Sequence, residues 1–212
     1  MTIRSWTAAL ALGAGLWASG VATQSMAADA DSNYIVRGYG GQPCQAYLTA
    51  VTSSIEEVQP YLVWMEGYIS GVNRLQTETF DASPIIPSAD MGQLVATLCQ
   101  QSPDAQFERA VLALLELFKP YRIREQSQLI EMTVGDTSGA IRQETMRWMQ
   151  EKMIEKGFFT ATPDGRFGPD TQLALRAYQR ARELPVTGVP DGETIVNFIR
   201  EDIQAPGTEA AQ

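Results

Sequence analysis

The sequence predicts an all-α protein in which a disulfide-bridged helical bundle precedes a smaller three-helix domain. Apolar residues recur at spacings of three and four along most of the chain, and prolines and glycines separate these stretches. Both cysteines fall in the first half. Hydrophobic residues make up 44% of the 212 positions, which is enough to build two small cores.

The N-terminus has the features of a secretory signal peptide. Arg4 precedes a weakly apolar Ser5–Ala22 stretch, and Ser25-Met26-Ala27 supplies the small residues of a cleavage site. We therefore expect residues 1–27 to be removed, leaving a periplasmic, envelope-associated protein with no stable membrane span. An uncleaved membrane anchor is the alternative, but the apolar run is short and interrupted by glycine.

The two cysteines, Cys44 and Cys99, predict one disulfide bond. In an oxidising compartment an even number of thiols favours a bridge over a metal pair or a redox couple. The bond would close a loop of 55 residues, and on the chain-entropy model such a loop adds about 4 kcal/mol of stability. Two unpaired buried thiols are the alternative.

Helical periodicity predicts a disulfide-bridged domain at residues 43–120, after a flexible arm at 28–42 that has no sustained period. Four helices are expected: one from Cys44, one from about Glu56 to Arg74, one capped by Ser88-Ala89-Asp90, and one opened by Ser102-Pro103-Asp104 and ended by Pro120. Their apolar positions are Tyr47, Leu48 and Val51; Val58, Tyr61, Leu62, Met65, Tyr68, Ile69 and Val72; Met91, Leu94, Val95, Leu98 and Cys99; and Phe107, Val111, Leu114, Leu115 and Phe118.

A second helical domain is predicted at residues 141–201. Residues 121–140 mix charges and glycine with few apolar positions, so we expect a linker that is partly helical, and residues 202–212 are expected to be a disordered tail. Turn signals divide the domain into three helices. The apolar stripes are Met146, Met149, Met153 and Ile154; Leu173, Ala174, Leu175, Ala177 and Tyr178; and Ile195, Val196, Phe198 and Ile199.

Residues from about Gly139 to Ile199 carry an ordered set of turn and core positions. The set comprises Met149-Gln150, Met153, Gly157-Phe158-Phe159, Asp164–Thr171, Ala174-Leu175, Tyr178-Gln179, Leu184–Gly188 and Thr194. In order and spacing it resembles the small three-helix peptidoglycan-binding domain of bacterial wall hydrolases and other envelope proteins. Two departures are a methionine at the usual first-helix leucine and a Gly-Asp-x-Gly entry, Gly135–Ser138, displaced about one turn upstream.

The resemblance implies that the C-terminal domain binds peptidoglycan, with a cation for the carboxylates of the peptide stem. We predict contacts from the Asp-Gly turn and the second helix, at Asp164, Gly165, Arg166, Phe167, Arg176 and Arg180, with Arg182 as a further cation. A solvated surface arginine is the alternative for each. Much of the motif also has a structural reading, in which Gln179 satisfies backbone groups of a turn.

Composition excludes several functions. The chain has no histidine, which removes Ser-His-Asp and Cys-His catalysis and the usual zinc hydrolase sites. We therefore expect no enzymatic activity, no cofactor and no metal. With 16 basic and 25 acidic residues and no basic run, nucleic acid is an improbable partner. The remaining enzyme class is a wall glycosidase with Glu66, between Trp64 and Tyr68, as the acid; a surface glutamate is the favoured alternative.

Three segments of the first domain, Pro43–Leu48, Trp64–Gly71 and Leu98–Pro103, are similar to small disulfide-bridged periplasmic helical proteins. These are the HdeA acid-stress chaperone family and immunity-type proteins that neutralise wall-cleaving toxins. The main hypothesis is a non-enzymatic envelope protein that binds peptidoglycan through its C-terminal module and presents the first domain to a protein partner. An acid-stress chaperone or an immunity or inhibitor protein is the alternative.

Overall fold

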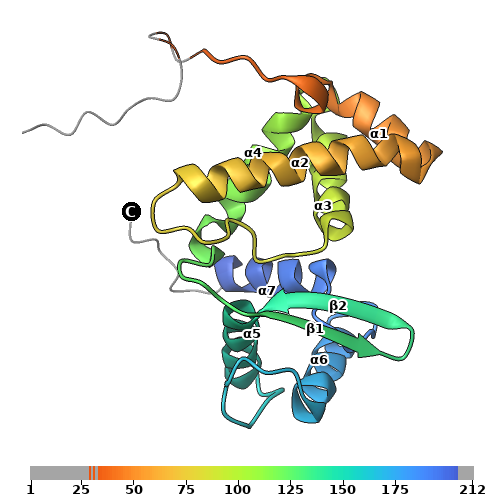
Figure 1. Cartoon of the computed structure of the whole chain (residues 1–212). Coiled ribbons are helices and arrows are strands. Elements are labelled where there is room, and N and C mark those ends of the chain that lie inside the picture. Colours follow the sequence, from red (N-terminus) through yellow and green to blue (C-terminus); the bar gives the residue numbers. More distant parts are fainter. Residues whose placement is uncertain (1–28, 30, 32, 205–212) are drawn as a thin grey trace, which may run out of the picture. The chain divides into compact units, whose positions relative to one another are not determined.

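The computed structural model describes residues 29, 31 and 33–204, so the predicted signal peptide and residues 205–212 of the predicted tail lie outside the described residues. Within the described part of the chain, residues 36–204 belong to one unit. Among the described residues are seven α-helices, two 3-10 helices (η) and one hairpin (Figure 1), which confirms the predicted all-α class apart from the small hairpin. The elements are η1 Gly38–Gly41, α1 Cys44–Ser53, α2 Ile55–Leu75, α3 Ser88–Gln101, α4 Phe107–Phe118, η2 Lys119–Tyr121, β1 Leu129–Val134, β2 Thr137–Arg142, α5 Gln143–Glu155, α6 Pro169–Ala181 and α7 Gly192–Gln204.

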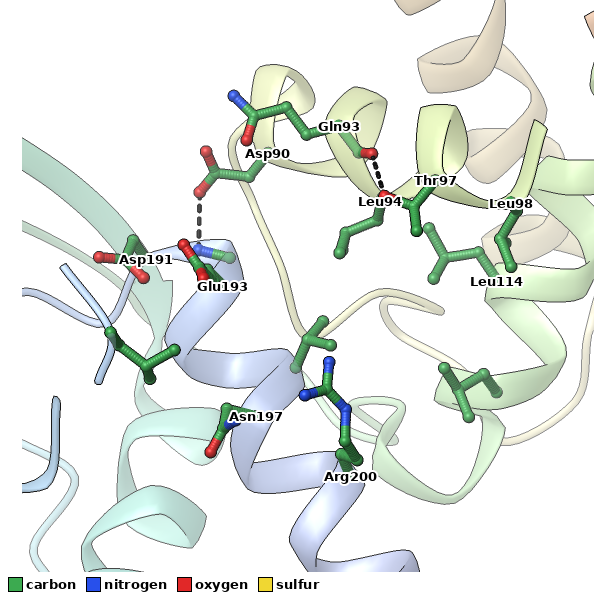
Figure 2. Close-up of a pocket in the computed structure, with 14 residues that line it drawn as sticks. Asp90, Gln93, Leu94, Thr97, Leu98, Leu114, Asp191, Glu193, Asn197 and Arg200 are labelled. Carbon is green, nitrogen blue, oxygen red and sulfur yellow. Dashed lines mark hydrogen bonds between the residues drawn. The ribbon is translucent and has the colours of Figure 1, made fainter. Parts of the chain in front are cut away.

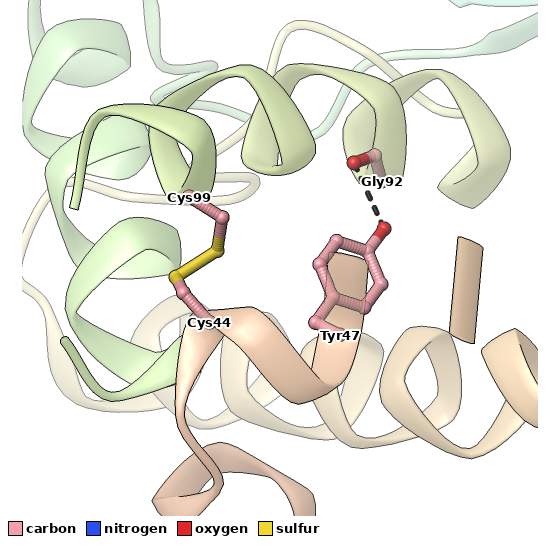
Figure 3. Close-up of a disulfide and its surroundings, with 4 residues drawn as sticks. All are labelled: Cys44, Tyr47, Gly92 and Cys99. Carbon is pink, nitrogen blue, oxygen red and sulfur yellow. Dashed lines mark hydrogen bonds between the residues drawn. A yellow bond between two sulfur atoms is a disulfide. The ribbon is translucent and has the colours of Figure 1, made fainter. Parts of the chain in front are cut away.

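The disulfide joins the start of α1 to the end of α3 (Figure 3). Cys44 and Cys99 are fully buried with their Cα atoms 5.0 Å apart, so the predicted pairing is confirmed. One turn along α1, the Tyr47 hydroxyl donates to the Gly92 carbonyl oxygen at 2.9 Å. A Cβ on Gly92 would lie 2.8 Å from that hydroxyl, so the close approach of α1 to α3 requires glycine.

Helix α4 begins at Phe107, later than the expected start at Ser102-Pro103-Asp104. The residues between α3 and α4 instead provide hydrogen-bond acceptors for the first turn of α1. The backbone N–H groups of Cys44 and Gln45 donate to the carbonyl oxygens of Ala105 (2.7 Å) and Pro103 (2.8 Å). The first turn of α1 has no side-chain cap, so this loop satisfies amides that a helix start leaves without partners.

The expected loose arm is ordered in its second half. Residues Gly38–Gly41 form η1, and the indole N–H of Trp64 donates to the Arg37 carbonyl oxygen at 2.8 Å. Gly40 is buried, and a Cβ there would lie 2.0 Å from the Trp64 ring. The arm therefore covers Trp64, which removes most of that indole from solvent.

The segment expected to be a partly helical linker contains the β1–β2 hairpin instead. Val134 pairs with Thr137 across a two-residue loop, and Gly135 takes φ +60°, as a tight hairpin turn favours. Ile130, Met132 and Val134 alternate with exposed neighbours along β1. This alternation is a strand signal, but it covers only one strand, because β2 holds Ser138 and Gly139 and shows no clear alternation of apolar residues.

The hairpin and helices α5–α7 form the C-terminal module. Its core combines most of the predicted stripe residues, but Leu173 and Ile154 are exposed, 66% and 40%, and were wrongly expected there. The rings of Tyr178 and Phe198 stack in this core with centroids 3.8 Å apart. The module contacts the bundle through three polar links. These are the Gly192 N–H to Asp90 (2.8 Å), the Tyr121 hydroxyl to Asp202 (3.0 Å), and the Arg142 guanidinium to Asp81 (3.7 Å).

Candidate functional site

A buried glutamine on α5 holds the predicted Asp-Gly turn. Gln150 is 1% exposed; its Oε1 accepts from the Gly165 N–H at 2.7 Å, and its Nε2 donates to the Arg166 carbonyl oxygen at 2.9 Å. The same Nε2 lies 2.9 Å from the Thr171 hydroxyl at the start of α6. Gly165 has φ +72°, and a Cβ there would lie 2.7 Å from the Gln143 carbonyl oxygen, so only glycine fits.

A second glutamine, on α6, repeats this arrangement at the next turn. Gln179 is fully buried; its Oε1 accepts from the Gly188 N–H at 2.8 Å, and its Nε2 donates to the Val189 carbonyl oxygen and the Thr194 hydroxyl, each at 3.0 Å. Gly188 also has a positive φ, +74°. The predicted role of Gln179 is confirmed. Each turn is therefore held by hydrogen bonds to a buried glutamine, and its outer face faces solvent, where it can contact a ligand.

The outer face of the first turn carries exposed charge. The Arg166 side chain is 82% exposed and lies 3.9 Å from the Asp164 carboxylate. The Asp164 carboxylate accepts from the Arg166 backbone N–H at 2.8 Å, and this bond is the main cause that lowers the Asp164 pKa. Phe167 is half-buried and packs against the core. The turn thus presents an exposed carboxylate and an exposed guanidinium group to solvent.

Three candidate arginines, two within α6 and one directly after it, have different surroundings. Arg176 is half-buried and lies against the second turn. A Cβ built on Gly188 would be 2.7 Å from the Arg176 Nε. Arg180 is exposed. Arg182 pairs with Glu201 and lies over the Tyr178 ring at 5.3 Å, so it links α6 to α7. The first two are cations that can meet a ligand, whereas the third holds the fold.

A comparison with known families matches the part of the chain that contains both turns. Residues 142–196 match the family model described as "Putative peptidoglycan binding domain". The match begins at the end of β2, includes α5 and α6 with both glutamine-held turns, and ends within α7. It does not extend to the bundle. No curated protein and no solved structure matches the chain. The C-terminal module is therefore similar to this peptidoglycan-binding family over residues 142–196, and no family model matches the bundle.

Glu66 lies on the outer side of α2 with a second carboxylate nearby. Burial and the charge of Asp81 raise the Glu66 pKa. Burial also raises the Asp81 pKa, against the opposing effects of a hydrogen bond to the Ser83 amide and of Arg142. The sequence did not reveal this neighbour, because Asp81 follows α2 in an irregular segment whose path no periodicity predicts.

A groove at the junction of bundle and module was also not apparent in the sequence (Figure 2). It has a volume of about 470 Å³ and is lined by α3, α4 and α7 together with the loop before α7. Its residues come from segments about a hundred positions apart, so their proximity depends on the packing of α7 against α3. No signal within either segment could have placed them together.

Proposed function

We propose that this protein is a non-enzymatic, periplasmic envelope protein that binds peptidoglycan through its C-terminal module and presents the bundle to a protein partner. The family match at residues 142–196 is the observation that carries the proposal. The buried Cys44–Cys99 disulfide supports an oxidising, extracytoplasmic compartment. Among the described residues no helix is long and apolar enough to cross a bilayer.

Wall binding in this proposal uses the outer faces of the two held turns. Peptidoglycan offers carboxylates and amides on its peptide stems and hydroxyl groups on its sugars as partners. Arg166 and Arg180 supply exposed guanidinium groups for the carboxylates, and Arg176 supplies a third at the second turn. Because Gln150 and Gln179 fix the turns beforehand, little conformational entropy is lost on binding.

The bundle is proposed to be an interaction domain and not an enzyme, because the whole chain lacks histidine. Acyl-transfer and zinc-hydrolase machinery of the usual kinds needs that residue. The family match does not cover the bundle and so assigns no reaction to it. Its partner is a protein, which a crosslinking experiment with exported chain can capture and identify.

Co-sedimentation of the full chain with purified sacculi tests wall binding. Arg166→Gln and Arg180→Gln are expected to reduce the bound fraction, each by about fivefold in affinity at low salt, because each removes one exposed charge contact. Arg74→Gln is the matched control, since Arg74 is an exposed arginine at the end of α2. Equal pelleting of all variants with wild type would contradict the assignment of these arginines.

One observation favours a second candidate, a wall glycosidase. Glu66 and Asp81 are carboxylates whose pKa values are both raised, mainly by burial, and the charge of Asp81 contributes to the raised pKa of Glu66. Glycoside hydrolysis uses two carboxyl groups, one of which acts as an acid with a raised pKa. The test is the turbidity of a sacculus suspension. Loss of turbidity with wild type and not with Glu66→Gln would establish this activity; a constant turbidity with both supports the non-enzymatic proposal.

A further inference from the structure

A cavity around Trp148, the Trp148 pocket, lies where the bundle joins the module. It has a volume of about 650 Å³ and is lined by η2 and the two residues after it, by one face of α5 and by the end of α7. The rings of Tyr121 and Trp148 belong to this lining, with centroids 5.2 Å apart. The two turns proposed to bind the wall contribute no residue to it. The pocket therefore offers aromatic surface to a ligand other than the wall.

The lining holds four carboxylates and two basic groups. Lys152 pairs with Asp202 at 2.8 Å and with Glu155 at 3.1 Å, so its charge is already matched. The side chain of Arg122 is only 13% exposed, and it donates to two backbone carbonyl oxygens. Both cations are therefore engaged within the protein, and neither neutralises the other two carboxylates.

Those two carboxylates flank Trp148 along α5. Glu144 and Glu151 are exposed and lie four positions before and three positions after Trp148, which puts the three side chains on one face of the helix. In the part of the chain that the structure describes, neither glutamate makes an ion pair or a side-chain hydrogen bond. Partial burial and the charge of Glu125 raise the Glu144 pKa, against the smaller effects of two nearby arginines. This face therefore favours a cation.

A buried hydroxyl in the same lining has no partner. Thr145 is 4% exposed, and its Oγ makes no hydrogen bond with any residue that the structure describes. A buried polar group in this state costs free energy, and most such groups in proteins are paired. An N–H donor from a bound ligand would relieve this cost. The hydroxyl thus points to a ligand independently of the charges.

We propose that the Trp148 pocket binds an arginine side chain of a partner protein. The guanidinium group stacks on the Trp148 indole and pairs with Glu151, whose side chain leans toward Trp148 because helical side chains tilt toward the N-terminus. Five N–H donors on one planar group allow a further bond to Thr145. A lysine ammonium is compact and strongly hydrated, and it fits this set less well.

This inference rests on the proposed function for the existence of a protein partner, and it adds where and by what chemistry that partner is held. Peptidoglycan carries no guanidinium group, so the contact is separate from wall binding. Because the pocket and the two turns share no residue, the protein can bind its partner and the wall at the same time.

Nuclear magnetic resonance of the full chain, labelled with nitrogen-15 and purified with its disulfide intact, tests the pocket. The probe is the capped peptide acetyl-Ala-Arg-Ala-amide. The control is the same peptide with citrulline, which has the shape of arginine without its charge. The indole N–H signal of Trp148, identified by its absence in Trp148→Phe, should shift saturably with the arginine peptide and much less with the citrulline peptide. The Trp64 signal should stay in place, because that indole N–H is bonded to Arg37 and lies outside the pocket.

Variants of the two glutamates test the ion pair. Glu151→Gln should weaken peptide binding about fivefold and Glu144→Gln about twofold, because only the first carboxylate leans toward Trp148. Glu131→Gln and Glu193→Gln remove exposed carboxylates outside the pocket and should bind as wild type does. No saturable shift in wild type, equal shifts with both peptides, or binding unchanged in Glu151→Gln would overturn the inference.

The hydroxyl of Thr145 has a test of its own. Thr145→Val keeps the shape of the side chain and removes an unpaired buried group, so its melting temperature should equal or exceed that of wild type. Its affinity for the arginine peptide should fall about threefold. Unchanged affinity in Thr145→Val would show that the hydroxyl is not part of the site, and would remove that contact from the proposal.

Sedimentation with sacculi separates this inference from the proposed function. The Glu144→Gln, Glu151→Gln double variant should pellet at least as strongly as wild type, and weaker pelleting would mean that the pocket binds the wall and that the inference is wrong. If wild type pellets and does not bind the arginine peptide, the inference is wrong and wall binding stands. If wild type binds the peptide and does not pellet, the pocket stands and the proposed wall-binding function is wrong.

Discussion

The Asp90 carboxylate, on α3, accepts a hydrogen bond of 2.8 Å from the backbone N–H of Gly192, the first residue of α7. A residue of the bundle therefore caps a helix of the module across 102 positions of sequence. A Cβ on Gly192 would lie 2.6 Å from the Asp90 Cβ, so glycine permits the contact. This cap fixes the place of α7 and with it one wall of the groove.

Removing the cap should destabilise the chain moderately. Asp90→Ala is expected to lower the free energy of unfolding by about 1 kcal/mol, because the first turn of α7 loses its acceptor. Asp90→Asn keeps an acceptor oxygen and should lose less. Urea unfolding followed by circular dichroism measures both. An Asp90→Ala variant as stable as wild type would mean that the contact carries no net energy.

The same carboxylate predicts a pH dependence. Burial, with a smaller effect of Asp191, raises the Asp90 pKa above its ordinary value of 3.8, against the opposing Gly192 hydrogen bond. The folded state therefore binds a proton more readily than the unfolded state. Relative to Asp90→Asn, wild type should gain stability as pH falls through the folded pKa and level off below the unfolded one. A difference between the two proteins that stays constant from pH 7 to pH 3 would contradict this.

Loss of either buried glutamine should destabilise the module strongly. Gln150→Ala leaves the buried Gly165 N–H without its acceptor, and Gln179→Ala leaves the Gly188 N–H without its acceptor. The Thr171 and Thr194 hydroxyls each lose one of their hydrogen bonds. We expect a loss of about 2–4 kcal/mol for each variant, from unsatisfied buried groups. Thermal unfolding measures it. A loss below that of Asp90→Ala would show that the turns do not depend on these side chains.

Two glycines with similar backbone angles should respond differently to alanine. Gly165 and Gly157 have φ of +72° and +78°, but a Cβ at Gly165 would lie 2.7 Å from the Gln143 carbonyl oxygen, whereas a Cβ at Gly157 meets nothing within 4 Å. Gly157→Ala should cost about 1 kcal/mol from backbone strain alone, and Gly165→Ala clearly more. Equal losses in chemical denaturation would show that the turn relaxes around the new methyl group.

Reduction of the disulfide should weaken the bundle. The Cys44–Cys99 bond closes a loop of 55 residues, for which the chain-entropy model gives about 4 kcal/mol. The Cys44→Ala, Cys99→Ala double variant should therefore melt well below wild type, and added reductant should lower the melting temperature of wild type and not of the variant. A wild type unaffected by reductant would contradict the predicted contribution.

Periodicity and turn residues predicted the helices and the module because both are local signals. Met146, Met149 and Met153 recur on one face, and Asp164-Gly165 marks a turn whatever surrounds it. The hairpin was missed because only its strand β1 alternates clearly, while β2 holds Ser138 and Gly139. The groove was missed for a different reason, since Arg200 and Leu94 meet only through packing between distant helices.

Pelleting of the full chain with purified sacculi tests the central claim most directly. The account predicts that wild type co-sediments, that Arg166→Gln and Arg180→Gln reduce the bound fraction, and that Arg74→Gln does not. Higher salt should release the protein, because exposed charges carry part of the binding. A wild-type chain that stays in the supernatant at low salt would contradict the claim that this module binds the wall.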